Sequence, residues 1–319
     1  MKRYLTSVMG AAILSAASAV LAMPASAQSW PSQRVTIVVP FGAGSVTDIL
    51  ARIFADEMGK QWHQQVIVEN RPGLAGTGGV AKSAPDGNTL MLTSNGHTVA
   101  GLVSKDAPFD PVKDFAGITR IGSAPLFLIT SPNLPVTTLK DVIDLAKKDP
   151  GKLNFSSPGL ASTTFIAGAL FRKAAGINIV HVPFRSAPDA VTAVMRGDAQ
   201  LYFAPVNLAR DQSQAGKVKA IAAATAQRIP EMPNTPTFTE AGLPFVYDSW
   251  FGLLAPRAVP KPIIEKIAKD WAVALKSPDM QEKLKKQFLI GVSDTPEAMD
   301  KRIAEETANL TKVFKEAGI

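Results

Sequence analysis

The 319-residue sequence predicts an α/β protein built from two lobes. Residues 35–52 and 153–171 share one order of segments, in which a short apolar run is followed by a loop of small residues and then by a helix. Residues 118–130 and 245–254 are longer β-like runs, and we interpret each as a crossing from one lobe to the other. Two similar units and two crossings therefore predict two lobes joined by a hinge.

Residues 1–27 are predicted to form a signal peptide. Lys2 and Arg3 precede an apolar run over residues 5–23, and Ala25-Ser26-Ala27 then has the small residues of a cleavage site. A transmembrane anchor is the alternative, because the run is nearly long enough to span a bilayer. Ala and Ser dominate the run and a cleavage site follows at once, so we expect export with cleavage near Ala27.

The composition of the chain excludes several classes of function. About 290 residues remain after cleavage, which is enough for two lobes with a substantial core. The absence of cysteine excludes disulfides, thiolate catalysis and Cys-ligated metals. Lys and Arg (34) outnumber Asp and Glu (27), but no basic run exceeds two or three residues, so no nucleic-acid partner is expected.

The first strand–loop–helix unit, residues 35–52, predicts an anion site. A β-branched run ends at Pro40, a glycine-containing loop follows, and Ser45 and Asp48 have the spacing of a capping box at a helix start. No Lys or Arg occurs in residues 35–51, so an anion bound here would be held by backbone N–H groups at the positive end of the helix. A βα turn without any ligand is the alternative interpretation.

A second polar loop is expected at the same edge of this sheet. Strands are predicted at residues 66–68 and 89–93, with a short helix at residues 76–83 between them. The strand at residues 89–93 ends in the loop Ser94-Asn95-Gly96-His97. If the sheet is parallel, this loop lies beside residues 41–45 and both loops line one crevice.

His97 is a candidate ligand contact or general base. The chain has only two other histidines, His63 and His181, and no H-E-x-x-H pattern, so a metal site is not expected. We interpret His97 as a solvated or capping residue.

The second strand–loop–helix unit, at residues 153–171, follows a predicted helix at residues 138–148. Ser162 can cap its helix, and no cation occurs before Arg172. Two neutral loops, each beside a helix N-terminus, predict two binding surfaces that face one another across a cleft.

The remaining segments complete two lobes. Strands at residues 179–184, 200–203 and 219–224 and a helix at residues 187–196 belong to the second lobe. Three C-terminal helices are expected to pack back on the first lobe; they span residues 262–275, 278–286 and 296–314. The predicted boundaries are residues 28–127 and 251–319 for lobe 1 and residues 128–250 for lobe 2.

Short motifs along the whole mature chain give the sequence a family resemblance. In order they are Trp30-Pro31-Ser32, Pro40-Phe41-Gly42-Ala43-Gly44, Thr47-Asp48, Glu69-Asn70-Arg71-Pro72-Gly73, Ala84-Pro85-Asp86-Gly87, Thr93-Ser94-Asn95-Gly96, residues 156–162, His181-Val182-Pro183 and Thr295-Pro296-Glu297. With these motifs the sequence resembles the periplasmic solute-binding receptors of tripartite tricarboxylate transporters, the Bug family.

The resemblance implies a type II periplasmic-binding-protein fold, or Venus flytrap, with two hinge crossings. Such a receptor closes on a small organic carboxylate in the periplasm and delivers it to the membrane subunits of its transporter. It is expected to be a monomer without catalytic activity, cofactor or metal.

The resemblance also implies the residues that bind the carboxylate through backbone amides and small hydroxyls. They are Phe41, Ala43, Gly44, Ser45, Thr47, Ser94, Asn95, Ser157 and Ser162. The chain departs from the usual family pattern at Ser45, which stands for a second glycine, and at Val46. It departs again at Ala161-Ser162 and Phe165, where the family commonly has Gly-Ser and His.

Phe165 and one further departure, Ala204, suggest the type of ligand. Ala204 stands where many relatives carry an Asp, and without that carboxylate a ligand ammonium would lack its partner. Phe165 replaces a polar His at the expected mouth of the second loop, where, like Phe41, it could stack on a flat ligand. The resemblance therefore implies an aromatic or dicarboxylic acid that lacks an amine.

An exported hydrolase and a ligand-responsive sensor partner are the alternative functions. Thr47 stands where a dinucleotide fingerprint needs its third glycine, and the chain has neither a P-loop nor a G-x-S-x-G elbow. No Ser–His–acid triad or carboxylate pair can be proposed from the sequence. An enzyme is therefore not expected.

Overall fold

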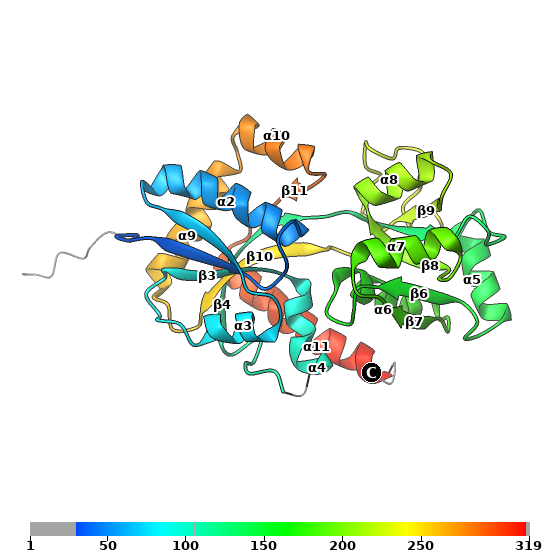
Figure 1. The fold of residues 1–319 in the computed structure, drawn as a ribbon, viewed down its shortest axis with the longest axis horizontal. Helices are drawn as coiled ribbons and strands as arrows, with labels where there is room; N and C mark the ends of the chain where they lie inside the picture. The colour runs from blue at the N-terminus through cyan, green and yellow to red at the C-terminus, as the bar shows by residue number, and fades with distance from the viewer. Residues whose placement is uncertain (1–29, 105, 317–319) are drawn as a thin grey trace, which may run out of the picture.

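The computed structural model describes residues 30–104 and 106–316, so the predicted signal peptide and its cleavage site lie outside the described residues. Two β-sheets, each flanked by helices, lie side by side along the longest axis of the molecule (Figure 1). The predicted two-lobed α/β fold is confirmed. None of the helices in the described part of the chain is both long enough and apolar enough to cross a membrane.

The first sheet has six strands in the order β11-β4-β10-β3-β1-β2. Its members are β1 (Val35–Val39), β2 (Val66–Asn70), β3 (Thr89–Ser94), β4 (Phe115–Ser123), β10 (Trp250–Pro256) and β11 (Ile290–Gly291). Strand β1 runs parallel to β2 and β3, whereas β10 runs antiparallel to β3 and β4. The valines and the isoleucine of β1 are completely buried, because helices cover both faces of the sheet.

Helices cover the two faces of the first sheet. They are α2 (Val46–Trp62), α3 (Leu74–Ala81), α9 (Lys261–Ala274), α10 (Pro278–Lys286) and α11 (Pro296–Glu316), with the shorter η1 (Asn95–Val99) and α4 (Ala100–Val103) after β3. Helices α2, α9 and α10 share one core, in which the ring centroids of Phe54 and Trp271 are 5.5 Å apart. Helices α3 and α11 contribute Val80, Met299 and Ile303 to the core on the other face.

The second sheet has five strands in the order β7-β6-β8-β5-β9. They are β5 (Leu126–Thr130), β6 (Asn154–Ser157), β7 (Val180–Pro183), β8 (Leu201–Pro205) and β9 (Lys219–Ala223). Helices α5 (Leu139–Lys148) and α6 (Thr163–Ala175) pack on one face, and α7 (Ala187–Arg196) and α8 (Val206–Gln214) pack on the other. Strand β6 is parallel to β7 and β8, so the loop after β6 lies at one end of the sheet.

The chain crosses between the sheets twice. The β-like run at residues 118–130 is two strands, because β4 ends at Ser123 in the first sheet and β5 starts at Leu126 in the second. The return run is shorter than predicted, since β10 begins only at Trp250. The N–H of Ala124 donates to the carbonyl of Ser249 at 3.0 Å, so the two crossings lie side by side. The lobe boundaries given above lie within a few residues of these points and stay a prediction.

The last helix packs on both lobes. Met299 and Ile303, in its first half, lie in the core of the first lobe, as expected. Its second half differs from the prediction, because Leu310, Val313 and Phe314 lie in the core of the second lobe. Helix α11 therefore bridges the hinge (Figure 1).

We expect Gly117→Ala to destabilise the protein, because the added Cβ would lie 2.7 Å from Cγ of Met299 and 3.0 Å from the backbone nitrogen of Asp300. Overpacking of this kind costs about 1–3 kcal/mol of unfolding free energy, which chemical denaturation can measure. The matched control is Gly79→Ala in α3, where nothing lies within 4 Å of the new atom and helix propensity favours alanine. Equal stability of the two variants would contradict the packing of α11 against β4.

Candidate functional site

Helix α2 begins at the predicted cap, where Ser45 Oγ accepts a hydrogen bond from the N–H of Asp48 at 3.2 Å. The carboxylate of Asp48 reaches back and accepts from the N–H of Gly44 at 2.9 Å. Arg52 and Asn70 also donate to it, at 3.0 and 2.9 Å. Burial alone would raise the pKa of Asp48, but hydrogen bonds from Arg52, Gly44 and Asn70 lower it below its usual value.

This arrangement leaves fewer free N–H groups than the sequence predicts. The N–H of Gly44 is not available to a ligand anion, because it already donates to the carboxylate of Asp48. Within the described residues, the N–H groups of Ala43, Val46 and Thr47 have no hydrogen-bond partner. These three groups remain at the positive end of α2 to hold an anion.

The loop after β3 turns its polar side chains into the protein. Ser94 Oγ accepts from the N–H of Gly96 at 3.3 Å, and Asn95 Nδ2 donates to the hydroxyl of Tyr247. Ser94 and Asn95 are both buried. Since Tyr247 belongs to the core of the second lobe, its hydrogen bond ties a loop of the first lobe to the second.

The loop after β6 also uses its hydroxyls internally. Ser157 Oγ lies 2.7 Å from Nε2 of His181. Ser162 caps α6 by accepting from the N–H of Phe165 at 3.1 Å, and it donates to the carbonyl of Gly159 at 2.7 Å. Burial lowers the pKa of His181 to about 4, so this imidazole is neutral at neutral pH.

Two of the predicted site residues lie away from any opening. Phe165 does not stand at a mouth, because its fully buried ring packs against His181 and Phe314 at centroid distances of 4.6 and 5.4 Å. Ala204 is also fully buried, in the core under α7 and α8, where it pairs with Phe127 of β5. Phe165 lies beside the loop after β6, but neither residue lines the cavity described below, so neither supports the expected type of ligand.

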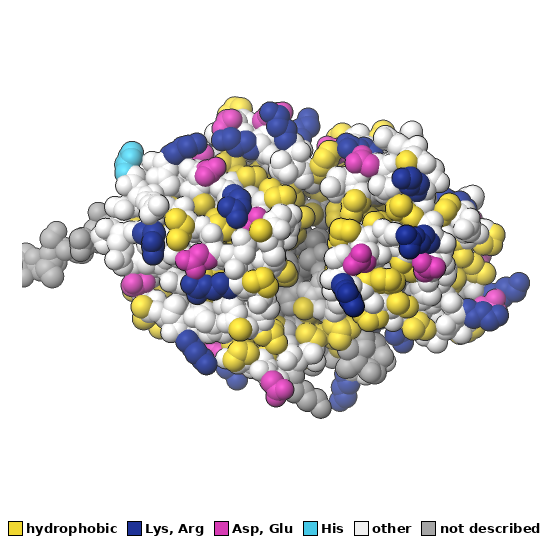
Figure 2. All heavy atoms as spheres, viewed as in Figure 1, with side chains coloured by type: hydrophobic (Ala, Val, Ile, Leu, Met, Phe, Trp, Pro, Cys, Tyr) yellow, Lys and Arg dark blue, Asp and Glu magenta, His cyan; other side chains and the backbone are white. Residues whose placement is uncertain are grey.

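A cavity of about 420 Å³ lies where loops of the two lobes meet. Its lining comes from the loop after β1, the start of α3, the segment from β3 to α4, and the loop after β6. The lining residues are Pro40, Phe41, Gly73, Leu74, Thr77, Thr93, Gly96, His97, Ala100, Val103, Ser104, Phe109, Leu160 and Ala161. No charged side chain occurs among these described residues, and hydrophobic side chains lie on both sides of the furrow between the lobes (Figure 2).

The two lobes touch beside this cavity. A Cβ built on Gly96 of the first lobe would lie 2.0 Å from the carbonyl oxygen of Ala161 in the second lobe. Only glycine allows the two backbones to approach this closely. The structure therefore represents a closed arrangement of the lobes.

His97 is not the solvated or capping residue that the sequence predicts. Its ring is buried, stacks on Phe109 at a centroid distance of 5.9 Å, and places Nε2 3.0 Å from the carbonyl oxygen of Pro111. Because a carbonyl only accepts, Nε2 carries the proton in this hydrogen bond. Burial lowers the pKa of His97 to about 4, so the side chain is a neutral part of the cavity wall.

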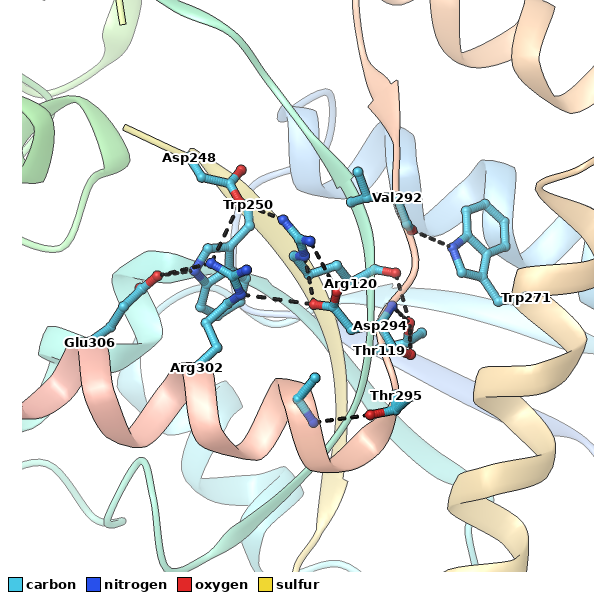
Figure 3. Close-up of polar contacts among 11 residues, drawn as sticks. Thr119, Arg120, Asp248, Trp250, Trp271, Val292, Asp294, Thr295, Arg302 and Glu306 are labelled. Atoms are coloured by element: carbon cyan, nitrogen blue, oxygen red, sulfur yellow. Dashed lines mark hydrogen bonds and ion pairs between the residues drawn. The ribbon is translucent and has the colours of Figure 1, made fainter. Parts of the chain in front are cut away.

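A cluster of charges lies at the hinge, away from the cavity lining. Arg120 of β4 donates through Nε to Asp294 at 2.6 Å and also binds Asp248, which precedes β10 (Figure 3). Arg302 of α11 lies 3.5 Å from the carboxylate of Asp248 and 3.8 Å from that of Asp294. The cluster joins both crossings to the C-terminal helix.

Glu306 of α11 completes the hinge cluster. Its carboxylate accepts a hydrogen bond from Nε1 of the buried Trp250 at 2.8 Å and lies 3.7 Å from Arg302 (Figure 3). Burial raises the pKa of Glu306 to about 7, although Trp250 and Arg302 oppose the shift. No group of His, Asp or Glu in the described ranges has an arrangement that could hold a metal ion.

The sequence predicts one wall of the cavity but not the wall formed by α3, α4 and the loop before β4. Phe41 was predicted and lines the cavity, whereas Leu74, Thr77, Val103 and Phe109 were not. Leu74 and Thr77 lie in α3, Val103 lies in α4 and Phe109 lies in the loop before β4, and the position of these segments in space depends on the whole sheet. No local motif marks them.

Two lobes joined by a double crossing, with a neutral cavity closed by loops from both, define a solute-binding receptor. Residues 50–319 match the family described as tripartite tricarboxylate transporter family receptor, TctC, and the chain belongs to this family. The resemblance drawn from the sequence motifs is thereby confirmed.

Known relatives extend over nearly the whole chain. The chain is similar to Protein BugT of Bordetella pertussis, with 30% identity over 308 residues that cover 95% of this chain and 94% of BugT. It is similar to the solved structure of R. palustris Rpa4515 with adipate, with 31% identity, a TM-score of 0.78, and coverage of 91% of this chain and 99% of that chain. It is also similar to MatC from Rhodopseudomonas palustris with bound malate, with 29% identity, a TM-score of 0.75, and coverage of 89% and 99%.

We expect Gly96→Ala to hold the lobes apart, because the new Cβ would clash with the carbonyl oxygen of Ala161. Small-angle X-ray scattering should then give a larger radius of gyration for this variant than for the wild type. Gly101→Ala in α4 is the control, since the nearest atom to its Cβ is 4.0 Å away. An unchanged radius of gyration in Gly96→Ala would contradict the contact between the two loops.

We expect the free energy of unfolding to fall as the pH rises, because the folded protein favours the protonated form of Glu306. Its ordinary pKa of 4.5 is raised to about 7 in the folded state, so the folded protein binds more protons than the unfolded chain between these values. The stability that Glu306 contributes is complete below pH 4.5 and is lost as the pH rises through about 7, a change of about 3 kcal/mol.

Glu306→Gln should therefore lose less stability than the wild type between pH 5 and pH 8, as measured by urea denaturation at each pH. Glutamine keeps an acceptor for Trp250 but does not titrate. Glu305→Gln, at an exposed position on the same helix, is the matched control and should follow the wild type. Identical pH profiles for wild type and Glu306→Gln would show that Glu306 does not titrate in this range.

Proposed function

We propose that this protein is a periplasmic receptor that captures a small organic carboxylate between its lobes and delivers it to the membrane subunits of a tripartite tricarboxylate transporter. The observation that carries the proposal is the neutral cavity at the meeting point of the two lobes. A ligand in this position would contact both lobes and so stabilise the closed arrangement, which a membrane partner can then recognise.

The ligand carboxylate is held by backbone N–H groups in this proposal. The free N–H groups of Ala43, Val46 and Thr47 lie at the positive end of α2, and Phe41 of the same loop lines the cavity. The similar proteins solved with adipate and with malate hold carboxylates, which supports the same class of ligand here. Among the predicted binding residues, we keep Phe41, Ala43 and Thr47 as the first contacts.

The Ser157–His181 contact is the one feature that would favour a hydrolase, because the two side chains are 2.7 Å apart. Ser157 is fully buried, so a substrate could not reach its hydroxyl. His181 packs against Phe155 and Phe165, at ring-centroid distances of 5.1 and 4.6 Å, and burial lowers its pKa to about 4, which makes it a weak base. We therefore infer a structural role for this pair and no catalytic activity.

The remaining parts of the proposal follow from the family. The protein would be exported by its signal peptide, cleaved near Ala27, and would act as a monomer in the periplasm without a cofactor or metal. A role as a ligand-responsive sensor partner would use the same closure, and binding of a carboxylate without any transport defect in a deletion strain would favour it.

We expect carboxylates to raise the Tm of the purified protein. A ligand present at a hundredfold excess over its Kd adds about 2.7 kcal/mol to the free energy of unfolding, which corresponds to several degrees. Differential scanning fluorimetry with mono-, di- and tricarboxylates measures the effect, on protein refolded to remove any retained ligand. A flat response to the whole panel would contradict the receptor function.

A further inference from the structure

We propose that Asn95 and Tyr247 form a latch between the lobes, and that this latch sets the affinity for the carboxylate by positioning the cavity wall and not by contacting the ligand. This inference rests on the proposed function and gives Asn95 a different role from the ligand contact that the sequence implies. The side chain of Asn95 is 1% exposed and is not part of the cavity lining, whereas the next two residues, Gly96 and His97, line the cavity.

The latch belongs to a segment that lies between the two lobes. Helices η1 and α4 together span residues 95–103 and follow β3 of the first lobe. On one side of this segment, Ala100 belongs to a core of the first lobe. On the other side, Val99 is completely buried in the core of the second lobe, and Val103 packs against the same core. Because Ala100 and Val103 also line the cavity, the position of this segment between the lobes shapes the cavity wall.

The hydrogen bond of the latch joins groups that are fixed to different lobes. Asn95 directly follows β3, and its backbone carbonyl accepts a hydrogen bond from Oγ1 of Thr98 at 2.7 Å. Tyr247 is held on the second lobe by its backbone N–H, which donates to the carbonyl of Ala224, directly after β9, at 3.0 Å. A rotation of the lobes about the hinge must therefore separate Nδ2 of Asn95 from the hydroxyl of Tyr247.

Both partners of this hydrogen bond are buried in the closed arrangement. Burial raises the pKa of Tyr247 well above its usual value, so the phenol keeps its proton and its oxygen accepts from Asn95. A buried amide donor that loses its acceptor carries an unmet desolvation cost. In an open arrangement water can hydrate both groups, so loss of the hydroxyl disfavours the closed arrangement relative to the open one.

The affinity for a ligand depends on the population of the closed arrangement. An acid that contacts both lobes binds tightly only when they are closed, so its apparent affinity scales with the closed fraction. Loss of the latch should therefore weaken the binding of every acid by the same factor, whatever the length of the acid. If Asn95 contacted the ligand directly, the factor would differ from acid to acid and Tyr247→Phe would have no effect.

The test measures the binding of adipate, malate and the other acids of the Tm panel by isothermal titration calorimetry. In Tyr247→Phe the Kd of each acid should rise by a common factor of about five or more. The double variant with Asn95→Ala should bind no more weakly than the weaker single variant, because both substitutions remove the same hydrogen bond. Unchanged affinities in Tyr247→Phe, or a factor that differs between acids, would overturn this inference and leave the receptor function intact. Failure of every acid to bind the wild type would overturn both proposals.

Thr130→Val is the matched control for the loss of a buried hydroxyl from the second lobe. Thr130 is completely buried at the end of β5 that is remote from the crossing, and its Oγ1 has no hydrogen-bond partner among the described residues. Its removal should leave the affinities unchanged, with each variant shown to be folded by circular dichroism. A loss of affinity in Thr130→Val as large as that in Tyr247→Phe would overturn the assignment of the latch, because general loosening of the second lobe would then explain both.

Discussion

One largely buried cation, Arg120, sets the geometry on which the rest of the molecule depends. Its guanidinium binds Asp248 ahead of β10 and Asp294 ahead of α11, so both crossings and the C-terminal helix meet at one point. Because Arg120 and Asp294 are largely buried, breaking their contact is more costly than breaking an exposed ion pair. The orientation of the lobes, and with it the distance between the loops around the cavity, therefore depends on this cluster.

Charge and binding surface are separated in this protein. The charges that the fold buries are gathered at the hinge or paired locally, as in Asp48 with Arg52, while the described cavity lining is neutral. Asp48 shows how the separation works: its carboxylate occupies the N–H of Gly44 and offsets part of the positive potential at the start of α2. The positive potential left at the start of α2 is therefore moderate, which suits the proposed receptor because it must also release its ligand.

Local chemistry made much of the fold predictable. The hydroxyls of Ser45 and Ser162 cap helices where the sequence places them, and Gly197 ends α7 in the left-handed conformation. Helix α8 was missed because it starts after Pro205 without a side-chain cap. The orientation of the predicted site residues was harder to predict. Strand β8 is buried on both faces and has no polar face to mark its orientation, so nothing in the sequence indicates that Ala204 faces a core.

Helix α11 limits how the lobes can move. It is one continuous helix from Pro296 to Glu316, and its two halves belong to different cores. A hinge rotation that separates the loops around the cavity must therefore bend this helix or withdraw Phe314 from its contact with Phe165. In the second case a hydrophobic patch would be exposed on the surface of the empty receptor alone. The filled and empty forms would then differ in their tendency to associate with other molecules as well as in shape.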